Sequence, residues 1–333
     1  MLYRGFKSMF PAPHSFLIAL AIWSLVAMVP SRVAGGTKSE DGLVYGEAGG
    51  QRLTMDYYPP PGKGPHPVVI IIHGGGFVKG DSKNISEAYC ADFLVPAGYA
   101  VFSINYRLSP MFPLVAMVDD VERAVRFIRH NSAKWDADPT RIALLGGSAG
   151  GYLSNMAGLV GGVGNKDAAD PVARESAAVQ GVVTLYGMSD FQVLDQRPNW
   201  QQLFQPVSGE KGLRVALSEL SPINHVTSDA PPFLLIHGDK DPIVPFDQSI
   251  RFQTALEKVS ARCDLIVIHN GEHSTNEWHR IAGVPDWEKE LVQWLNEIFR
   301  HKGVIGEGIR ARIPGPSSRT LDSNGLRSDA NGK

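Results

Sequence analysis

A serine between glycines at residues 146–150 is the first candidate for covalent chemistry in this sequence. The segment reads Gly146-Gly147-Ser148-Ala149-Gly150 and has the pattern G-x-S-x-G. It directly follows an apolar run at residues 142–145 and precedes a stretch compatible with a helix at 152–159. A strand, a sharp turn and a helix in that order expose a nucleophilic hydroxyl. We therefore predict that Ser148 is a nucleophile, the alternative being an ordinary turn from a strand into a helix.

A run of glycines supplies the second chemical feature, which is made of backbone donors. The segment His73-Gly74-Gly75-Gly76 follows an apolar run at residues 68–72. Amide N–H groups of such a turn can point into a cleft and, together with the amide of Ala149, hold the negative oxygen of a tetrahedral intermediate. A flexible turn or a phosphate loop is the alternative. The pattern G-x-x-x-x-G-K-[ST] is missing from this segment, which argues against a phosphate loop.

A serine hydroxyl needs a histidine to take its proton and a carboxylate to orient that histidine. The sequence contains both downstream of Ser148, each just after an apolar run. The first run, at residues 233–236, leads into His237-Gly238-Asp239-Lys240-Asp241, and the second, at 265–268, leads into His269-Asn270-Gly271-Glu272-His273. The order Ser, Asp, His along the chain is typical of the α/β-hydrolases.

Two acids and three histidines compete for these roles. Asp241 is favoured over Asp239 because it lies deeper in its loop and is followed by a turn bounded by prolines. His273 is favoured because it lies in a glycine-containing loop after the last strand. We expect His269 to be a strand-end residue and His279 to lie on a helix. No pair of histidines matches a zinc motif such as H-E-x-x-H, so the sequence predicts neither a metal nor a cofactor.

The elements that position these residues alternate between short apolar strands and amphipathic helices. This alternation predicts an α/β fold with a mostly parallel sheet and helices on both faces. Two segments around Gly49-Gly50 predict an antiparallel hairpin at one edge of that sheet. Ligands bind outside the carboxyl ends of the strands in such sheets. The strands are predicted at residues 42–46, 52–58, 68–72, 100–104, 142–145, 179–186, 233–236 and 265–268, and the helices near 85–95, 118–128, 152–159 and 213–220.

The two ends of the sequence differ from this pattern. Arg4 and Lys7 precede an apolar run at residues 16–29, which small residues follow. That order predicts a signal peptide over residues 1–36 and a secreted or periplasmic location. The apolar run is shorter than the roughly 20 residues of a spanning helix, so an uncleaved anchor is the less favoured alternative. One catalytic domain is predicted at residues 37–300, with a candidate lid at 191–221, and residues 301–333 are predicted to be a disordered tail.

Charge and cysteine content restrict the partners. The 333 residues carry 32 basic and 34 acidic side chains, and no basic stripe is present, so nucleic acid is not an expected partner. The oligomeric state stays open. Cys90 and Cys263 are the only cysteines. An exported protein could oxidise them to one disulfide, but nothing in the sequence brings them together, and we expect two buried free thiols.

Taken together, these motifs resemble a known family over residues 42–300. The sequence is similar to the esterase and lipase group of α/β-hydrolases with an HGGG oxyanion motif, particularly the carbohydrate-esterase branch related to bacterial feruloyl and acetyl-xylan esterases. The resemblance implies a triad of Ser148, Asp241 and His273 and an oxyanion hole of Gly75, Gly76 and Ala149. It rests on the segments 73–77, 105–110, 138–142, 147–151 and 237–241.

The resemblance implies a serine carboxylesterase that hydrolyses short-chain acyl or aryl esters, either small molecules or esters on plant polysaccharide. A serine peptidase or amidase on the same fold is one alternative, and a non-catalytic binding protein with a hydrolase fold is the other. The sequence departs from the family at the last histidine, which usually has glycine neighbours and here lies between Glu272 and Ser274. Asp119 and Asp120 are expected to cap the helix after Pro113 or to pair with Arg107.

Overall fold

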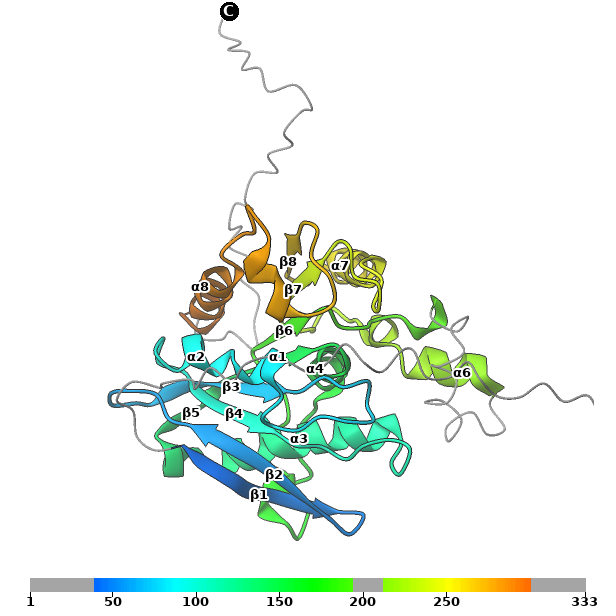
Figure 1. The fold of residues 1–333 in the computed structure, drawn as a ribbon. Helices are drawn as coiled ribbons and strands as arrows, with labels where there is room; N and C mark the ends of the chain where they lie inside the picture. Colours follow the sequence, from blue (N-terminus) through cyan, green and yellow to red (C-terminus); the bar gives the residue numbers. More distant parts are fainter. Residues whose placement is uncertain (1–38, 194–211, 301–333) are drawn as a thin grey trace, which may run out of the picture.

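One eight-stranded sheet forms the centre of the molecule (Figure 1). The computed structural model describes residues 39–193 and 212–300. The strand order is β1-β2-β4-β3-β5-β6-β7-β8. The pairs β1/β2 and β2/β4 are antiparallel, and every other pair is parallel. This arrangement confirms the predicted mostly parallel sheet with an antiparallel N-terminal edge.

Each predicted strand has an observed counterpart, but the strand predicted at 142–145 begins at Ala137, and the helices Asp247–Lys258 and Trp287–Arg300 were not predicted. The strands are β1 Glu40–Ala48, β2 Gln51–Tyr58, β3 His66–Ile72, β4 Ala100–Ile104, β5 Ala137–Gly147, β6 Gly181–Leu185, β7 Phe233–Gly238 and β8 Cys263–Ile268. The helices are α1 Ile85–Ala88, α2 Ala91–Leu94, α3 Leu114–His130, α4 Ala149–Val160, α6 Gly212–Glu219, α7 Asp247–Lys258 and α8 Trp287–Arg300.

Several predictions concern residues that the structure does not describe. The predicted signal peptide at 1–36, the predicted tail at 301–333 and most of the candidate lid at 191–221 lie outside the described residues. Within the described residues, no helix combines the length and the apolar composition that crossing a membrane requires.

The central strand β3 shows why the apolar runs in this sequence are continuous. Side chains alternate across a strand, and here Val68, Ile70 and Ile72 pack with buried residues of α3, α4 and α7. Val69 and Ile71 point to the opposite face and pack with buried residues of α2 and α8. Because helices cover both faces of the sheet, every position from Val68 to Ile72 is buried and apolar.

The segment after β3 differs from the predicted single helix at residues 85–95. It forms two short helices, α1 and α2, because the amides between them bond three residues back instead of four. The Cys90 N–H donates to the Glu87 carbonyl at 3.0 Å, and the Asp92 N–H donates to the Tyr89 carbonyl at 2.8 Å. Cys90 is buried, and Cys263 is the first residue of β8 and only partly buried. Both are free thiols, as expected, but the expected burial is observed for Cys90 alone.

A buried ion pair joins the chain after β4 to helix α3. The Arg107 side chain is 12% exposed and the Asp120 side chain 2%, and their closest charged atoms are 2.7 Å apart. Asp120 also accepts the Arg107 backbone N–H at 2.9 Å. Helix α3 begins at Leu114, so Asp119 and Asp120 do not cap it. Of the two expected roles, pairing with Arg107 is the one observed, and Asp120 is the residue that pairs.

The ion pair leads to a prediction about stability. Replacing Asp120→Ala leaves the Arg107 guanidinium without its partner in a largely buried site, so the free energy of unfolding should fall by about 3–5 kcal/mol. Asp119→Ala is the matched control, because its exposed side chain is adjacent in sequence, and it should change stability by no more than about 0.5 kcal/mol. Urea unfolding measures both, and equal losses in the two variants would contradict the prediction.

Candidate active site

Ser148 lies at a sharp turn between β5 and α4. Its backbone has φ 54° and ψ −116°, a conformation that costs a non-glycine residue about 1–3 kcal/mol. The neighbouring glycines allow the close contacts that hold this turn. A side chain at Gly150 would overlap the Ile72 carbonyl at the end of β3, and one at Gly146 would overlap the Gly150 carbonyl. The Ser148 N–H donates to the Leu185 carbonyl of β6 at 2.9 Å.

Ser148, His273 and Asp241 form a continuous hydrogen-bonded path. The His273 Nε2 atom lies 2.9 Å from the Ser148 Oγ atom, and the His273 Nδ1 atom lies 2.7 Å from the Asp241 Oδ2 atom. The three residues follow β5, β8 and β7, and these parallel strands all end at the same edge of the sheet. The topology therefore explains how residues so distant in sequence meet, as expected for ligand sites in such sheets.

The Asp241 carboxylate is fully buried and receives several hydrogen bonds. Its Oδ1 atom accepts the backbone N–H groups of Ile243 and Val244 at 2.8 and 2.9 Å. Burial acts to raise the pKa of Asp241, but hydrogen bonds from His237 and His273 outweigh burial and hold that pKa well below its usual range. The carboxylate is therefore ionised and can orient the His273 imidazole.

A second histidine contacts the same carboxylate oxygen and was not assigned a role from the sequence. The His237 Nε2 atom lies 3.1 Å from Asp241 Oδ2 and 3.1 Å from the Val244 carbonyl oxygen. Both neighbours are acceptors, so Nε2 carries the proton, while Nδ1 at 2.7 Å accepts from the Ser249 hydroxyl. His237 thus helps to fix Asp241. The only signal in the sequence is its place at the end of the strand four residues before that aspartate.

The rival residues lie apart from Ser148. Asp239 and His269 pair with each other, with His269 Nδ1 3.0 Å from Asp239 Oδ2, and the His269 side chain is 79% exposed. His279 lies in a 3₁₀ helix, as a helical position was expected, and its Nε2 atom is 3.4 Å from Glu288 Oε1. None of the three is hydrogen-bonded to Ser148 within the part of the chain that the structure describes.

Aromatic side chains hold the loop that carries His273. The Tyr186 ring follows β6 and packs on the His273 ring with centroids 4.7 Å apart. Trp278 packs edge-on against Tyr186 at 5.5 Å, and its indole N–H donates to the Glu272 carbonyl at 3.0 Å. These contacts join sequence-distant segments and were not predicted. They restrict the His273 imidazole even though its neighbours Glu272 and Ser274 depart from the glycine-rich pattern of the family.

The glycine loop after β3 is oriented by His73. The His73 Nδ1 atom donates to the Gly74 carbonyl at 2.7 Å, and the ring stacks on Tyr106 at 4.2 Å. Burial lowers the pKa of His73 to about 4, so the ring is neutral near pH 7. The Gly74 carbonyl and the Gly75 N–H belong to one planar trans peptide and point in opposite directions. The His73 bond therefore sets the direction of the Gly75 N–H.

Three backbone N–H groups of this region remain available. No hydrogen bond between described residues uses the N–H of Gly75, Gly76 or Ala149. The Ala149 N–H belongs to the first turn of α4, where no helical acceptor exists. Gly74, which precedes the first two, lies beside Ser148: a Cβ atom at Gly74 would be 3.4 Å from the Ser148 Cβ atom. Donors from both loops are thus free next to the serine.

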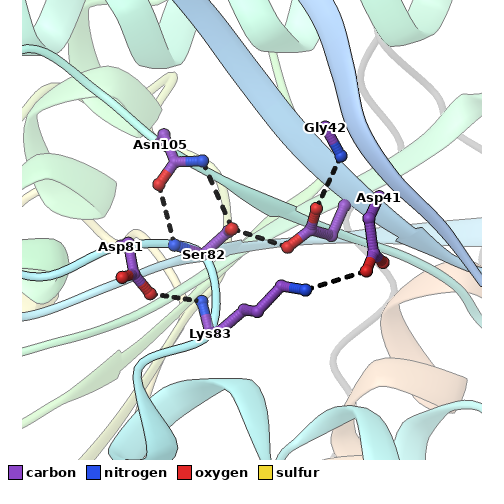
Figure 2. Close-up of a pocket in the computed structure, with 7 residues that line it drawn as sticks. Asp41, Gly42, Asp81, Ser82, Lys83 and Asn105 are labelled. Carbon is purple, nitrogen blue, oxygen red and sulfur yellow. Dashed lines mark hydrogen bonds and ion pairs between the residues drawn. The ribbon is translucent and has the colours of Figure 1, made fainter.

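The far end of the same loop is anchored to the sheet (Figure 2). The Ser82 N–H donates to Asn105 Oδ1 at 2.9 Å, and Asn105 Nδ2 donates to the Ser82 hydroxyl at 3.2 Å. The Ser82 hydroxyl in turn donates to Asp56 of β2 at 2.6 Å, and Asp56 accepts the Gly42 N–H of β1 at 2.8 Å. The antiparallel edge of the sheet therefore restrains the glycine loop, and the pocket at this network is part of that anchor.

The low pKa of Asp241 predicts an acid-dependent loss of stability. A carboxyl whose pKa is lowered by folding stabilises the protein above its unfolded value of about 3.9, and that contribution is lost as the pH falls. The free energy of unfolding of the unmodified chain should fall between pH 5 and pH 3. Asp241→Asn removes the contribution of this carboxyl, so the fall should be about 1 kcal/mol smaller in the variant. Urea unfolding at both pH values measures it.

Asp239→Asn is the matched control, since Asp239 lies on the same loop and pairs with a well exposed histidine. Its pKa is also lowered by His269, but solvent screens the pair, so its effect should be clearly smaller. An equal or larger effect for Asp239→Asn would contradict the prediction.

Comparison with known proteins identifies relatives of the chain. The sequence pattern of the BD-FAE family matches residues 55–256. Esterase LipQ of Mycobacterium tuberculosis is 34% identical over 235 residues, which are 66% of this chain and 53% of LipQ. Esterase LipC of the same organism is 33% identical over 201 residues, which are 59% of this chain and 49% of LipC. The chain thus spans about half the length of the curated relatives it matches.

Solved structures give the same result. An acetyl ester-xyloside bifunctional hydrolase from Caldicellulosiruptor lactoaceticus superposes with a TM-score of 0.67 at 30% identity, covering 75% of this chain and 89% of that one. A truncated carbohydrate esterase from gut microbiota superposes with a TM-score of 0.68 at 27% identity, covering 79% and 96%. With its family pattern, relatives and sheet topology in agreement, the chain belongs to the BD-FAE family and has the α/β-hydrolase fold.

Proposed function

We propose that the chain is a serine carboxylesterase in which Ser148, His273 and Asp241 are the catalytic triad. The observation that carries the proposal is the unbroken path of hydrogen bonds from Ser148 Oγ through His273 to the ionised Asp241. The names of the relatives support ester hydrolysis as the reaction, since LipQ and LipC are esterases. The free N–H groups of Gly75, Gly76 and Ala149 are the proposed oxyanion hole.

The proposed reaction has two steps. His273 Nε2 removes the Ser148 proton while Oγ attacks the ester carbonyl carbon, and the carbonyl oxygen becomes an oxyanion held by the backbone donors. The intermediate then collapses, the carbon–oxygen bond to the alcohol breaks, and His273 returns the proton to the departing oxygen. Water, deprotonated by His273, attacks the acyl-enzyme in the same way and releases the acid. Each oxyanion donor contributes about 3 kcal/mol to the rate.

The proposed substrate is an ester of a short acyl or aryl acid, either on a small molecule or on an extracellular polysaccharide. Two structural neighbours support this choice, because their names describe an acetyl ester-xyloside hydrolase and a carbohydrate esterase. Export by the predicted signal peptide would bring the enzyme to such a polymer, and a secreted or periplasmic location is part of the proposal.

The triad assignment is tested by substitution of the competing residues. Ser148→Ala and His273→Ala should each lower kcat for p-nitrophenyl acetate by about 10⁴-fold or more, because the nucleophile and its base act as a unit. His269→Ala and His279→Ala are the matched controls, and they should retain activity within about threefold because each ring pairs with another acid and neither is hydrogen-bonded to Ser148. A loss in His279→Ala with full activity in His273→Ala would contradict the assignment.

The substrate class is tested with p-nitrophenyl esters from acetate to palmitate, with Ser148→Ala as the blank. Serine-dependent release should be greatest for acetate or butyrate, and acetylated xylan and feruloylated sugars should then release their acids. Greatest activity on palmitate would contradict a short-chain esterase. Folded protein that hydrolyses no ester would contradict the proposed function and would favour an amidase or a binding scaffold.

A further inference from the structure

A buried acid outside the triad lies between the two loops that carry the proposed oxyanion donors. Glu87 of α1 is 1% exposed. A Cβ atom built on Gly147 would overlap the Glu87 Oε1 atom, and one built on Gly74 would be 3.1 Å from it. Gly147 directly precedes Ser148, and Gly74 directly precedes Gly75. The carboxyl group therefore fills the space that separates the serine turn from the glycine loop.

The surroundings of Glu87 provide hydrogen bonds but no compensating positive charge. The Asn84 Nδ2 atom donates to Glu87 Oε2 at 2.7 Å, and polar groups of Gly74, Ser86 and Tyr186 also face the carboxyl group and favour its charged form. No Lys, Arg or His of residues 39–193 and 212–300 forms an ion pair with it. Burial raises the pKa of Glu87 to about 7, although these four neighbours act to lower it.

The titratable groups that face Glu87 are neutral near pH 7. They are Tyr106 after β4, Tyr186 after β6 and Cys90 before α2, and burial raises the pKa of each, with a further increase from the Glu87 charge. His73, next to Gly74, is also neutral because burial lowers its pKa. An ionised Glu87 would therefore be an isolated negative charge, and its field would act on the two adjacent loops in a region of low dielectric.

We propose that Glu87 is a positioning residue for the esterase reaction, which holds the glycine loop against the serine turn in its protonated form and suppresses turnover when it ionises. The inference rests on the proposed function, because it concerns the oxyanion formed there. Like charges repel, so a carboxylate beside the donors opposes development of the oxyanion. Protonated Glu87 keeps the same packing against Gly74 and Gly147 without that repulsion.

This role gives the pH profile a descending limb. Activity falls as Glu87 loses its proton, so kcat/KM declines on the alkaline side. A purely structural role of Glu87 would lower activity equally at every pH and would leave no descending limb.

The test is the pH profile of kcat/KM for p-nitrophenyl acetate between pH 5 and pH 9.5. In the unmodified chain, kcat/KM should decline above about pH 7, approaching tenfold per pH unit as expected for one ionisation. Glu87→Gln cannot ionise, and the Asn84 amide can turn over to accept from the new side-chain N–H. This variant should keep activity within about threefold at pH 6.5 and lose the descending limb. A descending limb that persists in Glu87→Gln would overturn the proposal.

A second variant tests the same ionisation without changing the acid. Asn84→Ala removes a bond that lowers the pKa of Glu87, so the descending limb should move to higher pH by about one pH unit. Asp92→Asn is the matched control, an acid-to-amide change at an exposed position on the neighbouring helix α2, and it should leave the profile unchanged. A limb that does not move in Asn84→Ala, or moves equally in Asp92→Asn, would overturn the proposal.

A single-turnover reaction separates this inference from the proposed function. Diethyl p-nitrophenyl phosphate transfers its phosphoryl group to an activated serine oxygen and releases p-nitrophenolate, and mass spectrometry follows the adduct on Ser148. If no ester is hydrolysed but adduct formation shows the Glu87-dependent limb, the proposed function fails and the role of Glu87 stands. If esters are hydrolysed and the limb is unaltered in Glu87→Gln, the role of Glu87 alone fails. If Ser148 reacts with neither reagent, both fail.

Discussion

The strained turn at Ser148 is the constraint on which the rest of the site depends. Its positive φ is maintained because the turn lies between the ends of β3 and β6. On one side Gly150 packs against the Ile72 carbonyl, and on the other the Ser148 N–H donates to the Leu185 carbonyl. Neighbouring strands of the buried parallel sheet provide these close contacts on both sides. The continuous apolar strands are thus needed for the chemistry as well as for the core, because a looser sheet would let the turn relax.

The loops around this turn are each held by a contact that does not involve the serine. His73 fixes the peptide that carries the Gly75 N–H, while Ser82 anchors the other end of the same loop to β2 and β4. Tyr186 restricts the His273 ring, and His237 shares the Asp241 oxygen. Positions of reacting groups are therefore set by rigid neighbours before any substrate is bound, which lowers the reorganisation needed during the reaction.

The sequence predicted the residues that follow strands better than it predicted their neighbours. The sheet and the positions of Ser148, Asp241 and His273 at strand ends could be derived because apolar runs and loop residues are local patterns. The split of the 85–95 segment and the burial of Glu87 could not, because they depend on where other loops pack. His237 illustrates the difference, since its place at a strand end was visible in the sequence while its contact with Asp241 arises from the turn at residues 241–245.

Two buried acids near Ser148 have opposite pKa shifts, and the difference follows from their neighbours. Asp241 receives hydrogen bonds from two histidines and two backbone amides, so its charged form is favoured in spite of burial. Glu87 has no cationic partner among the described residues, so burial outweighs its polar neighbours and raises its pKa to about 7. Divergent environments of this kind assign different roles to acids of similar intrinsic strength. One carboxylate can therefore stabilise a positive imidazolium, while the other tolerates a nearby oxyanion when it is protonated.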